Sequence, residues 1–253
     1  MHILKFSKNC IIGKNNYIQS GVKLFDNIVI GDNNKIYDGT VIYPNTKIGN
    51  NNVILNNNIL GEHPIVTNTA NNNFEKKIFN GLEIGNNNFF HVSNLIFNGY
   101  VSKTIIGNNN KFLAEGHIGH DTNIHNNVVL YPRVITGGIS TLMDYSTIGM
   151  QSSIQQNSVL GKYSMIGMGN IASHNVFPYF IYFNQKYLRL NNIKIPDNFN
   201  LDVKILNSII DDIKIEFKNK NEINNIFLNK YDLSPQVQTD IIEFLDLIKI
   251  KKI

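Results

Sequence analysis

A six-residue period of large apolar side chains runs through most of this 253-residue chain. It holds without slip over residues 12–60, 84–96 and 106–166, apart from one interruption at Thr136. Such a period fits neither an amphipathic helix nor an alternating strand. It is typical of a β-helix, in which each step is one short strand plus a corner and three steps close one coil of 18 residues. We therefore predict a left-handed parallel β-helix of hexapeptide repeats.

The corners of this repeat carry a recurring Ile-Gly-X-Asn-Asn sequence. Five copies begin at Ile12, Ile30, Ile48, Ile84 and Ile106. Glycine and asparagine both adopt positive φ at little cost, so we expect left-handed backbone conformations at these residues. The residue two positions before each inward apolar residue should also point inward, and it is often small. A compositional bias could explain the abundance of asparagine but not its register.

Two segments leave the six-residue register. We predict that residues 63–81 form a loop that projects from one corner, and that Asn98 to Thr104 form a shorter interruption of the repeat. From about residue 199 the apolar spacing becomes helical, and Ser234-Pro235 resembles an N-cap followed by proline at the first helical position. We predict a β-helix domain over 1–184 with the loop insertion near 63–81. A small α-helical C-terminal domain over 199–253 should cover the open end of the prism.

Composition narrows the function classes. The net charge of +4 is modest and its cations are not clustered in the repeat, so we expect no nucleic-acid partner. A single cysteine, Cys10, excludes an intramolecular disulfide and suits a reducing compartment. The N-terminus has no leader pattern, and no apolar run reaches the length of a membrane span. We expect a cytoplasmic protein without a membrane span.

The candidate chemistry lies in the sequence His117-Ile118-Gly119-His120-Asp121. Because Ile118 points inward, both histidines should face outward. One coil after His120 comes Gly138, which would leave open access to the imidazole, and Gln156 follows one coil later. A neutral imidazole can accept a proton from a hydroxyl or an ammonium group near pH 7. No metal is expected, because neither a cysteine nor a carboxylate pair adjoins the histidines.

The stretch from residue 117 to residue 183 resembles the UDP-N-acetylglucosamine O-acyltransferases of lipid A biosynthesis. The matching residues are His-Ile-Gly-His-Asp (117–121), Thr136-Gly137-Gly138, Ile148-Gly149, Gln156 and Val176-Phe177-Pro178-Tyr179, preceded in the same order by Gly61-Glu62 and Leu82-Glu83-Ile84-Gly85. The resemblance implies acyl transfer from acyl-CoA or an acyl carrier protein thioester to a UDP-linked or other nucleotide-linked sugar, with no bound cofactor. It also implies a homotrimer whose site lies between two subunits.

The resemblance further implies roles for individual residues. His120 corresponds to the general base, Asp121 to its neighbouring carboxylate, and the backbone at Gly138 to the group that helps hold the thioester oxyanion. The resemblance also implies that further residues contact the substrates. These are His117, Gln156 and Asn191 or Asn192, together with Met165 and Met168 along the acyl groove.

Several positions depart from the family pattern. Ile139 and Gln155 stand where the family has histidines. Asn191 or Asn192 matches the asparagine of the family's uridine-contacting stretch, but Lys194-Ile195-Pro196-Asp197 lacks the glycine and the basic run that follow it in the family. Met168 occupies a position that is small where long acyl chains bind, which favours a short to medium acyl group. The alternative is an acetyl-CoA-dependent N-acetyltransferase of a nucleotide-linked amino sugar.

A third hypothesis is a non-catalytic β-helix scaffold or a metal enzyme resembling γ-carbonic anhydrase. The pair His120-Asp121 beside Gly138 argues against a scaffold. The lack of a third suitably placed histidine argues against the metal enzyme.

Overall fold

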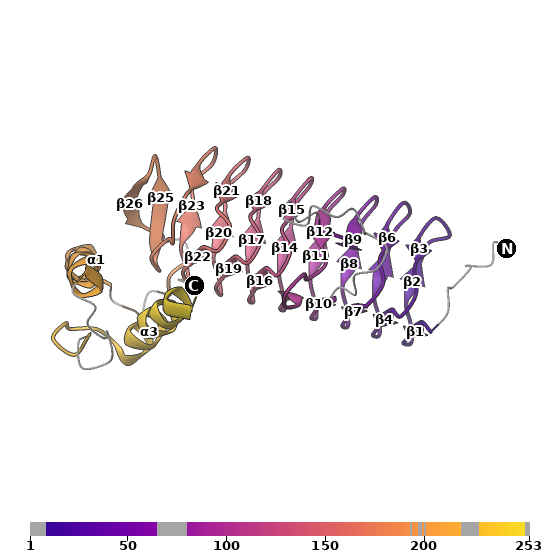
Figure 1. The fold of residues 1–253 in the computed structure, drawn as a ribbon, viewed down its shortest axis with the longest axis horizontal. Coiled ribbons are helices and arrows are strands. Elements are labelled where there is room, and N and C mark those ends of the chain that lie inside the picture. Colours follow the sequence, from indigo (N-terminus) through magenta and orange to yellow (C-terminus); the bar gives the residue numbers. More distant parts are fainter. Residues whose placement is uncertain are drawn as a thin grey trace.

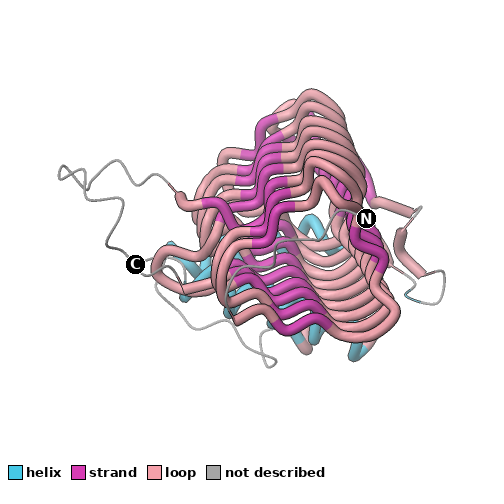
Figure 2. Tube along the Cα trace, turned by 90° about the vertical axis from the view of Figure 1, so that its right-hand side faces the viewer, coloured by secondary structure: helices cyan, strands magenta, loops and turns pink. Residues whose placement is uncertain are grey.

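The computed structural model describes residues 9–64, 80–192, 194–196, 199, 201–218 and 228–250. The predicted fold is confirmed: the chain winds as a left-handed parallel β-helix and ends in a small helical part (Figure 1). Each short strand pairs in parallel with the strand one coil later, as Ile12 does with Ile30. A view turned toward the end of the prism shows the coils superposed, with strands stacked in register (Figure 2).

Three sheets form the sides of the prism, and each takes every third strand up to β24; β25 and β26 then extend one of them. Sheet A comprises β1 (Ile11–Ile12), β4 (Val29–Ile30), β7 (Thr46–Ile48), β10 (Leu82–Ile84), β13 (Thr104–Ile106), β16 (Asn123–Ile124), β19 (Thr141–Leu142) and β22 (Val159–Leu160). Sheet B comprises β2 (Tyr17–Ile18), β5 (Lys35–Ile36), β8 (Val53–Ile54), β11 (Phe89–Phe90), β14 (Lys111–Phe112), β17 (Val129–Leu130), β20 (Thr147–Ile148), β23 (Met165–Ile166), β25 (Phe180–Phe183) and β26 (Lys186–Leu190). Sheet C comprises β3 (Lys23–Leu24), β6 (Val41–Ile42), β9 (Ile59–Glu62), β12 (Leu95–Phe97), β15 (His117–Ile118), β18 (Ile135–Thr136), β21 (Ser153–Ile154) and β24 (Ile171–Ala172). We name the corners after the sheets they join, in chain order: A–B, B–C and C–A.

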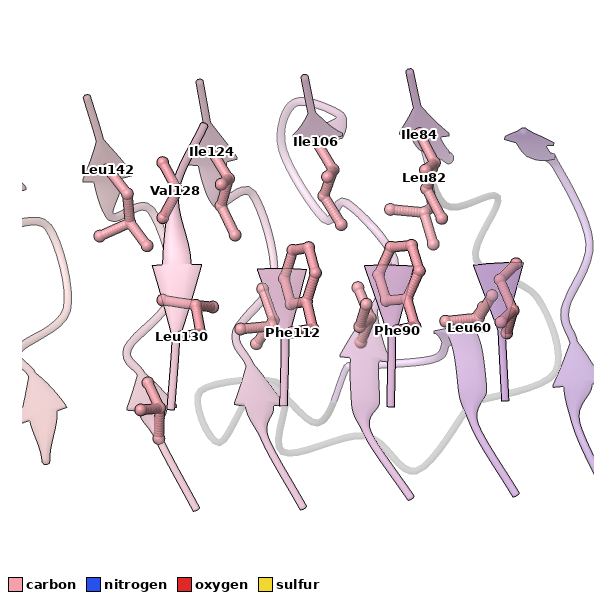
Figure 3. Packing of buried hydrophobic residues seen from close by; sticks show 14 of the residues in the cluster. Leu60, Leu82, Ile84, Phe90, Ile106, Phe112, Ile124, Val128, Leu130 and Leu142 are labelled. Atoms are coloured by element: carbon pink, nitrogen blue, oxygen red, sulfur yellow. The ribbon is translucent and has the colours of Figure 1, made fainter. Parts of the chain in front are cut away.

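The inward apolar residues stack into one core along the axis of the prism. On sheet B, Phe90 and Phe112 lie one coil apart with their ring centroids 4.5 Å from each other (Figure 3). Leu82 and Val128 add inward side chains from the positions two residues earlier in the step. Each fully buried side chain of this size contributes roughly 1.5–3 kcal/mol relative to exposure, so stacking supplies the driving force for the repeat.

A ladder of asparagines lines the inside of the A–B corner. Its members occupy the position two residues before the inward apolar residue, and they are Asn16, Asn34, Asn52, Asn88 and Asn110. The N–H of Asn52 donates to Asn34 Oδ1 at 2.8 Å, and its side-chain amide donates to Gly85 O at 2.9 Å. Buried polar groups need partners, and here each rung satisfies the next. This ladder gives the asparagine register a structural reason.

Positive φ occurs three residues after the inward apolar residue, at the first asparagine of the closing pair, as in Asn33 and Asn51. The expectation was therefore right for asparagine. It was wrong for the glycine that follows isoleucine, because Gly31 and its equivalents lack positive φ. A Cβ added at Gly31 would lie 2.7 Å from Gly49 O, so glycine is needed there for the close approach of successive coils.

The C-terminal elements cover the last coils. Strand β25 pairs with β23 in parallel and with β26 in antiparallel fashion, so the pairing of sheet B continues to Leu190, past residue 184. Helix α1 spans Val203–Lys218 and α3 spans Pro235–Ile250. As predicted, α3 begins after Ser234, whose carbonyl accepts the N–H of Gln238 at 3.1 Å. The division of the chain into two domains stays a prediction.

A second hydrophobic cluster joins the helices to the prism. It includes Met143 and Val159 from the outer side of sheet A, Phe177, and Phe244 of α3. The helical part thus packs beside β22 as well as near the end of the prism, where the β25–β26 hairpin extends sheet B (Figure 1). The predicted loop over 63–81 lies outside the described residues except for its ends. None of the helices described here is long and apolar enough to cross a membrane.

The asparagine ladder predicts a specific loss of stability. Asn52→Ala should lower the free energy of unfolding by about 1–3 kcal/mol, because the buried N–H of Asn88 then loses its acceptor. Lys35→Ala, at an exposed strand position, is the control and should change stability by less than about 0.5 kcal/mol. Equal stability of both variants in urea denaturation would refute a structural role for the ladder.

Candidate functional site

His120 lies at a C–A corner, in the turn that follows β15. Its Nδ1 is 2.6 Å from Asp121 Oδ2; the His120 side chain is 21% exposed and that of Asp121 only 2%. A Cβ added at Gly138 would lie 2.7 Å from His120 Nε2. Glycine at 138 therefore leaves the space that the imidazole occupies. The predicted stacking of Gly138 on His120 is present in the structure.

Three buried threonines hold the turn that carries His120. Thr104 Oγ1 accepts the N–H of Asp121 at 2.9 Å, and Thr122 Oγ1 donates to Gly119 O at 2.7 Å. Thr136 Oγ1 accepts the N–H of Gly119 at 3.2 Å. Thr136 is the residue that interrupts the aliphatic ladder, so this interruption supplies a polar contact directly above the turn, from the next coil. In the sequence, the replacement of an aliphatic residue by Thr136 was the feature that could have indicated this hydrogen bond to the turn.

Asp121 also binds a segment of the chain that the sequence did not connect to it. Its Oδ1 accepts the backbone N–H groups of Tyr100, Val101 and Ser102 at 3.0, 2.9 and 2.6 Å. Successive N–H groups that converge on one oxygen form an anion-binding nest. Asp121 adopts φ of +57°, a conformation that aspartate tolerates better than most residues. One carboxylate therefore fixes both the imidazole and residues 98–103.

The electrostatics favour an ionised Asp121, whose carboxylate orients the ring of His120. Burial alone would raise the pKa of Asp121, but hydrogen bonds from His120 and from the N–H groups of Ser102 and Val101 lower it below the ordinary aspartate value. An ionised carboxylate at Nδ1 holds the ring proton on that nitrogen. In the neutral imidazole the lone pair then lies on Nε2, the ring atom nearest a Cβ added at Gly138, where it can accept a proton from a substrate.

His117 occupies the outer face of sheet C rather than the corner. It pairs with Leu95 and Ile135 on the neighbouring strands, and its ring meets that of Phe97 edge to face at 5.1 Å. Burial lowers the pKa of His117, so its ring is neutral near pH 7. Its assignment as a substrate contact stays a prediction.

The other predicted site residues divide between two regions. Gln156 is exposed at the C–A corner one coil beyond Gly138, whose carbonyl accepts the N–H of Asn157 at 2.9 Å. Met165 lies on the outer side of β23, and Met168 is 63% exposed at a B–C corner. A single chain therefore brings His120, Asp121, Gly138 and Gln156 to one corner and leaves both methionines at other positions.

The two candidate asparagines have different environments. Asn191 is buried, its side-chain amide donates to Tyr163 O at 2.8 Å, and its N–H donates to Tyr179 O at 2.8 Å. It stabilises the exit from the β-helix and does not present its amide nitrogen to solvent. Asn192 is exposed and remains the candidate for a nucleotide contact.

A second histidine–aspartate pair lies at an A–B corner, outside the candidate site. His125 Nδ1 and Asp144 Oδ2 are 3.9 Å apart, too far for a hydrogen bond. Burial would raise the pKa of Asp144, but contacts with His125 and Asn126 lower it to about 2. Asp144 Oδ1 accepts the N–H of Asn126 at 2.8 Å, as asparagines do elsewhere on this corner. Within the described part of the chain, no three His, Cys, Asp or Glu residues form a group that could hold a metal ion.

Ile139 has an unusual backbone conformation directly beside the site. Its φ is +62°, and its N–H donates to His120 O at 2.8 Å. Most equivalent corners of the repeat have asparagine in this conformation, such as Asn157 one coil later with φ of +63°. A β-branched residue at positive φ is a genuine outlier. Such strain concentrates at functional sites.

Comparisons with known proteins agree with the fold and with the resemblance. A model of the bacterial transferase hexapeptide (six repeats) matches residues 27–62. A UDP-N-acetylglucosamine O-acyltransferase of Sinorhizobium fredii is 38% identical over 76 residues, and one of Rhizobium etli is 31% identical over 77 residues. Each aligned region covers 30% of this chain and 28% of the relative.

Solved structures extend the likeness over nearly the whole chain. The UDP-N-acetylglucosamine acyltransferase of Bacteroides fragilis is 26% identical with a TM-score of 0.75, and the match covers 96% of both chains. That of Campylobacter jejuni is 20% identical with a TM-score of 0.75, covering 94% of this chain and 93% of the other. The resemblance predicted from the residues is thus confirmed.

The strain at Ile139 leads to a reciprocal prediction. Ile139→Asn should raise the free energy of unfolding by about 1 kcal/mol, because asparagine adopts positive φ with less steric conflict. Asn157→Ile, the matched change one coil later, should lower it by a similar amount. Thermal unfolding measures both. A lower melting temperature for Ile139→Asn would mean that the isoleucine is held by packing and not under strain.

Proposed function

We propose that this chain is an acyltransferase that moves an acyl group from a thioester to a nucleotide-linked sugar, with O-acylation of UDP-N-acetylglucosamine as the first candidate. The observation that carries the proposal is the His120–Asp121 pair at 2.6 Å beside Gly138. The fold likeness to the Bacteroides fragilis acyltransferase supports the reaction class. The names of the relatives support the substrate class.

The proposed reaction begins with His120. Its Nε2 takes the proton of the acceptor hydroxyl while the hydroxyl oxygen attacks the thioester carbonyl. The carbonyl oxygen becomes an oxyanion, and the N–H of Gly138, which has no acceptor among the described residues, is suited to hold it. Collapse of this intermediate breaks the carbon–sulfur bond, and the imidazolium returns the proton to the leaving thiolate. No bound cofactor enters these steps.

A homotrimer is part of the proposal. The base lies at a C–A corner and Met168 at a B–C corner, and sheet C lies between these two corners. Packing three prisms around their C sheets would set the C–A corner of one subunit against the B–C corner of the next. Exposed apolar residues on the outer side of sheet C, Ile135 and Ile171, support such burial.

Acyl length and carrier are the finer parts of the proposal. The side chain of Met168 would shorten the acyl groove, which favours a short to medium chain carried by coenzyme A or by an acyl carrier protein. The alternative function, N-acetylation of a nucleotide-linked amino sugar from acetyl-CoA, is favoured by the same methionine and by Ile139 and Gln155 in place of histidines.

Thiol release from acyl donors tests the proposed reaction. Acetyl-CoA and a series of acyl carrier protein thioesters would be offered with UDP-N-acetylglucosamine or nucleotide-linked amino sugars. His120→Ala should lower the rate by roughly 100-fold or more while the oligomeric state is unchanged, since general-base catalysis contributes on that scale. His125→Ala, from the histidine–aspartate pair outside the site, is the matched control and should retain activity.

The acceptor that supports thiol release separates the two functions. Release with UDP-N-acetylglucosamine and an acyl carrier protein thioester identifies an O-acyltransferase. Release only with acetyl-CoA and an amino sugar identifies the N-acetyltransferase. Undiminished turnover by His120→Ala would contradict the assignment of the base.

The position of Met168 predicts chain-length preference. Met168→Gly should shift the preferred acyl chain to longer donors, with a roughly tenfold change in the ratio of rates, because each methylene buried contributes about 0.8 kcal/mol. Met150→Gly removes a methionine at the same corner one coil earlier. An equal shift from both variants, or none from Met168→Gly, would show that Met168 does not set the length of the groove.

A further inference from the structure

Residues 98–103 form the second insertion of the repeat, and they leave the C–A corner directly below the turn that carries His120. Strand β12 ends at Phe97, and β12 is the direct neighbour of β15 in sheet C. The insertion turns back tightly: a Cβ added at Gly99 would lie 1.9 Å from Ser102 O. The chain rejoins sheet A at Thr104, the residue whose hydroxyl accepts the N–H of Asp121.

The insertion is fixed mainly by Asp121. Besides three backbone N–H groups, the hydroxyl of Ser102 lies 3.2 Å from Asp121 Oδ1. Hydrogen bonds to an ionised acceptor are roughly twice as strong as neutral ones. The opposite oxygen, Oδ2, binds His120. The same buried carboxylate therefore sets the orientation of the imidazole and the position of the insertion.

The insertion is also joined to the end of the longer one. Gly81 and Gly99 form an antiparallel bridge, and Asn80 Nδ2 donates to Tyr100 O at 3.1 Å. Asn98 Nδ2 reaches Pro44 O, from the coil below the longer insertion, at 3.3 Å. Residues 98–103 are thus held from below and from above, which gives a loop of this length a defined conformation.

Two side chains of this loop define its outer side. The ring of Tyr100 meets the His120 imidazole edge to face, with centroids 6.1 Å apart. Val101 is 75% exposed at the tip. An acceptor that places its hydroxyl at His120 Nε2 would therefore have the loop, with Tyr100 closest to the imidazole, as its neighbour. Aromatic side chains offer large apolar area with a polar tip, a combination that suits a sugar ring.

We propose that residues 98–103 position the acceptor sugar, with Tyr100 as a specificity-determining residue and Asp121 as the positioning residue for both this loop and His120. The proposal rests on the proposed function for its substrate. It assigns the two oxygens of Asp121 to two different tasks: Oδ2 orients the base and Oδ1 holds the wall of the acceptor site.

Hydrogen exchange of the full-length protein tests the anchor without any need for activity. In Asp121→Asn the amides of residues 100–102 should exchange roughly tenfold faster or more, because the charged acceptor of their hydrogen bonds is lost. Asp144→Asn, a matched aspartate at the A–B corner, should leave their exchange unchanged. If Asp121→Asn does not fold, Val101→Pro removes one donor instead and should accelerate exchange at 100 and 102. Unchanged exchange in the loop would overturn the anchor.

Steady-state kinetics test Tyr100. Tyr100→Ala should raise the KM for UDP-N-acetylglucosamine roughly tenfold while the KM for the thioester changes less than about twofold, as expected for loss of acceptor binding alone. Tyr100→Phe should stay near wild type if the ring makes the contact, and Tyr17→Ala, an exposed tyrosine of the first coil, is the control. Equal changes in both KM values, or none, would overturn the role of Tyr100.

Hydrogen exchange and the kinetic assays test different parts of the proposal, so one can fail while the other succeeds. Absence of thiol release by the wild-type protein with every donor and acceptor would overturn the proposed function and with it the acceptor role of Tyr100. Hydrogen exchange would still decide whether Asp121 anchors the loop.

Discussion

The structure depends on one constraint: every coil must lie close to the next while most of its buried polar groups find hydrogen-bond partners. The asparagine ladder at the A–B corner meets this constraint, because each side chain bonds the backbone of a neighbouring coil. The corner glycines allow the coils to lie close together, because a Cβ on Gly31 would clash with the backbone of the next coil. A repeat built in this way has little freedom at its corners. Side chains placed there are held in fixed stacks, 18 residues apart.

The candidate site is a local variation of these corners. Asp121 occupies the position that has positive φ at most corners of the repeat, and its carboxylate contacts both His120 and the loop below. Thr136 replaces an aliphatic residue of the core, and its hydroxyl accepts a hydrogen bond from the turn that carries His120. Where the coil above would have asparagine, Ile139 keeps a strained conformation. The repeat tolerates these three unusual residues, because the neighbouring coils fix the backbone conformation around them.

The parts that follow the register could be predicted from the sequence. The stacking of Gly138 on His120 followed from counting one coil, and the start of α3 followed from Ser234-Pro235. Counting fails at an insertion, so nothing in the sequence connected Tyr100 or Ser102 with Asp121. It fails also after the repeat ends: the burial of Asn191 depends on long-range packing that no period encodes.

The same geometry separates the two groups of residues in the proposed site of a single chain. A three-sided prism presents the base at one corner and the residues proposed to line the acyl groove at another, and the sheet between them separates the two. Neither corner can reach the other within one coil, because the core fills the prism. In the proposed trimer, a neighbouring copy would bring the second corner to the first. In the proposed trimer the loop held by Asp121 would face the acceptor from the subunit that supplies the base, while the neighbouring subunit would supply the groove. Acceptor choice and acyl length would then depend on different subunits and could change independently.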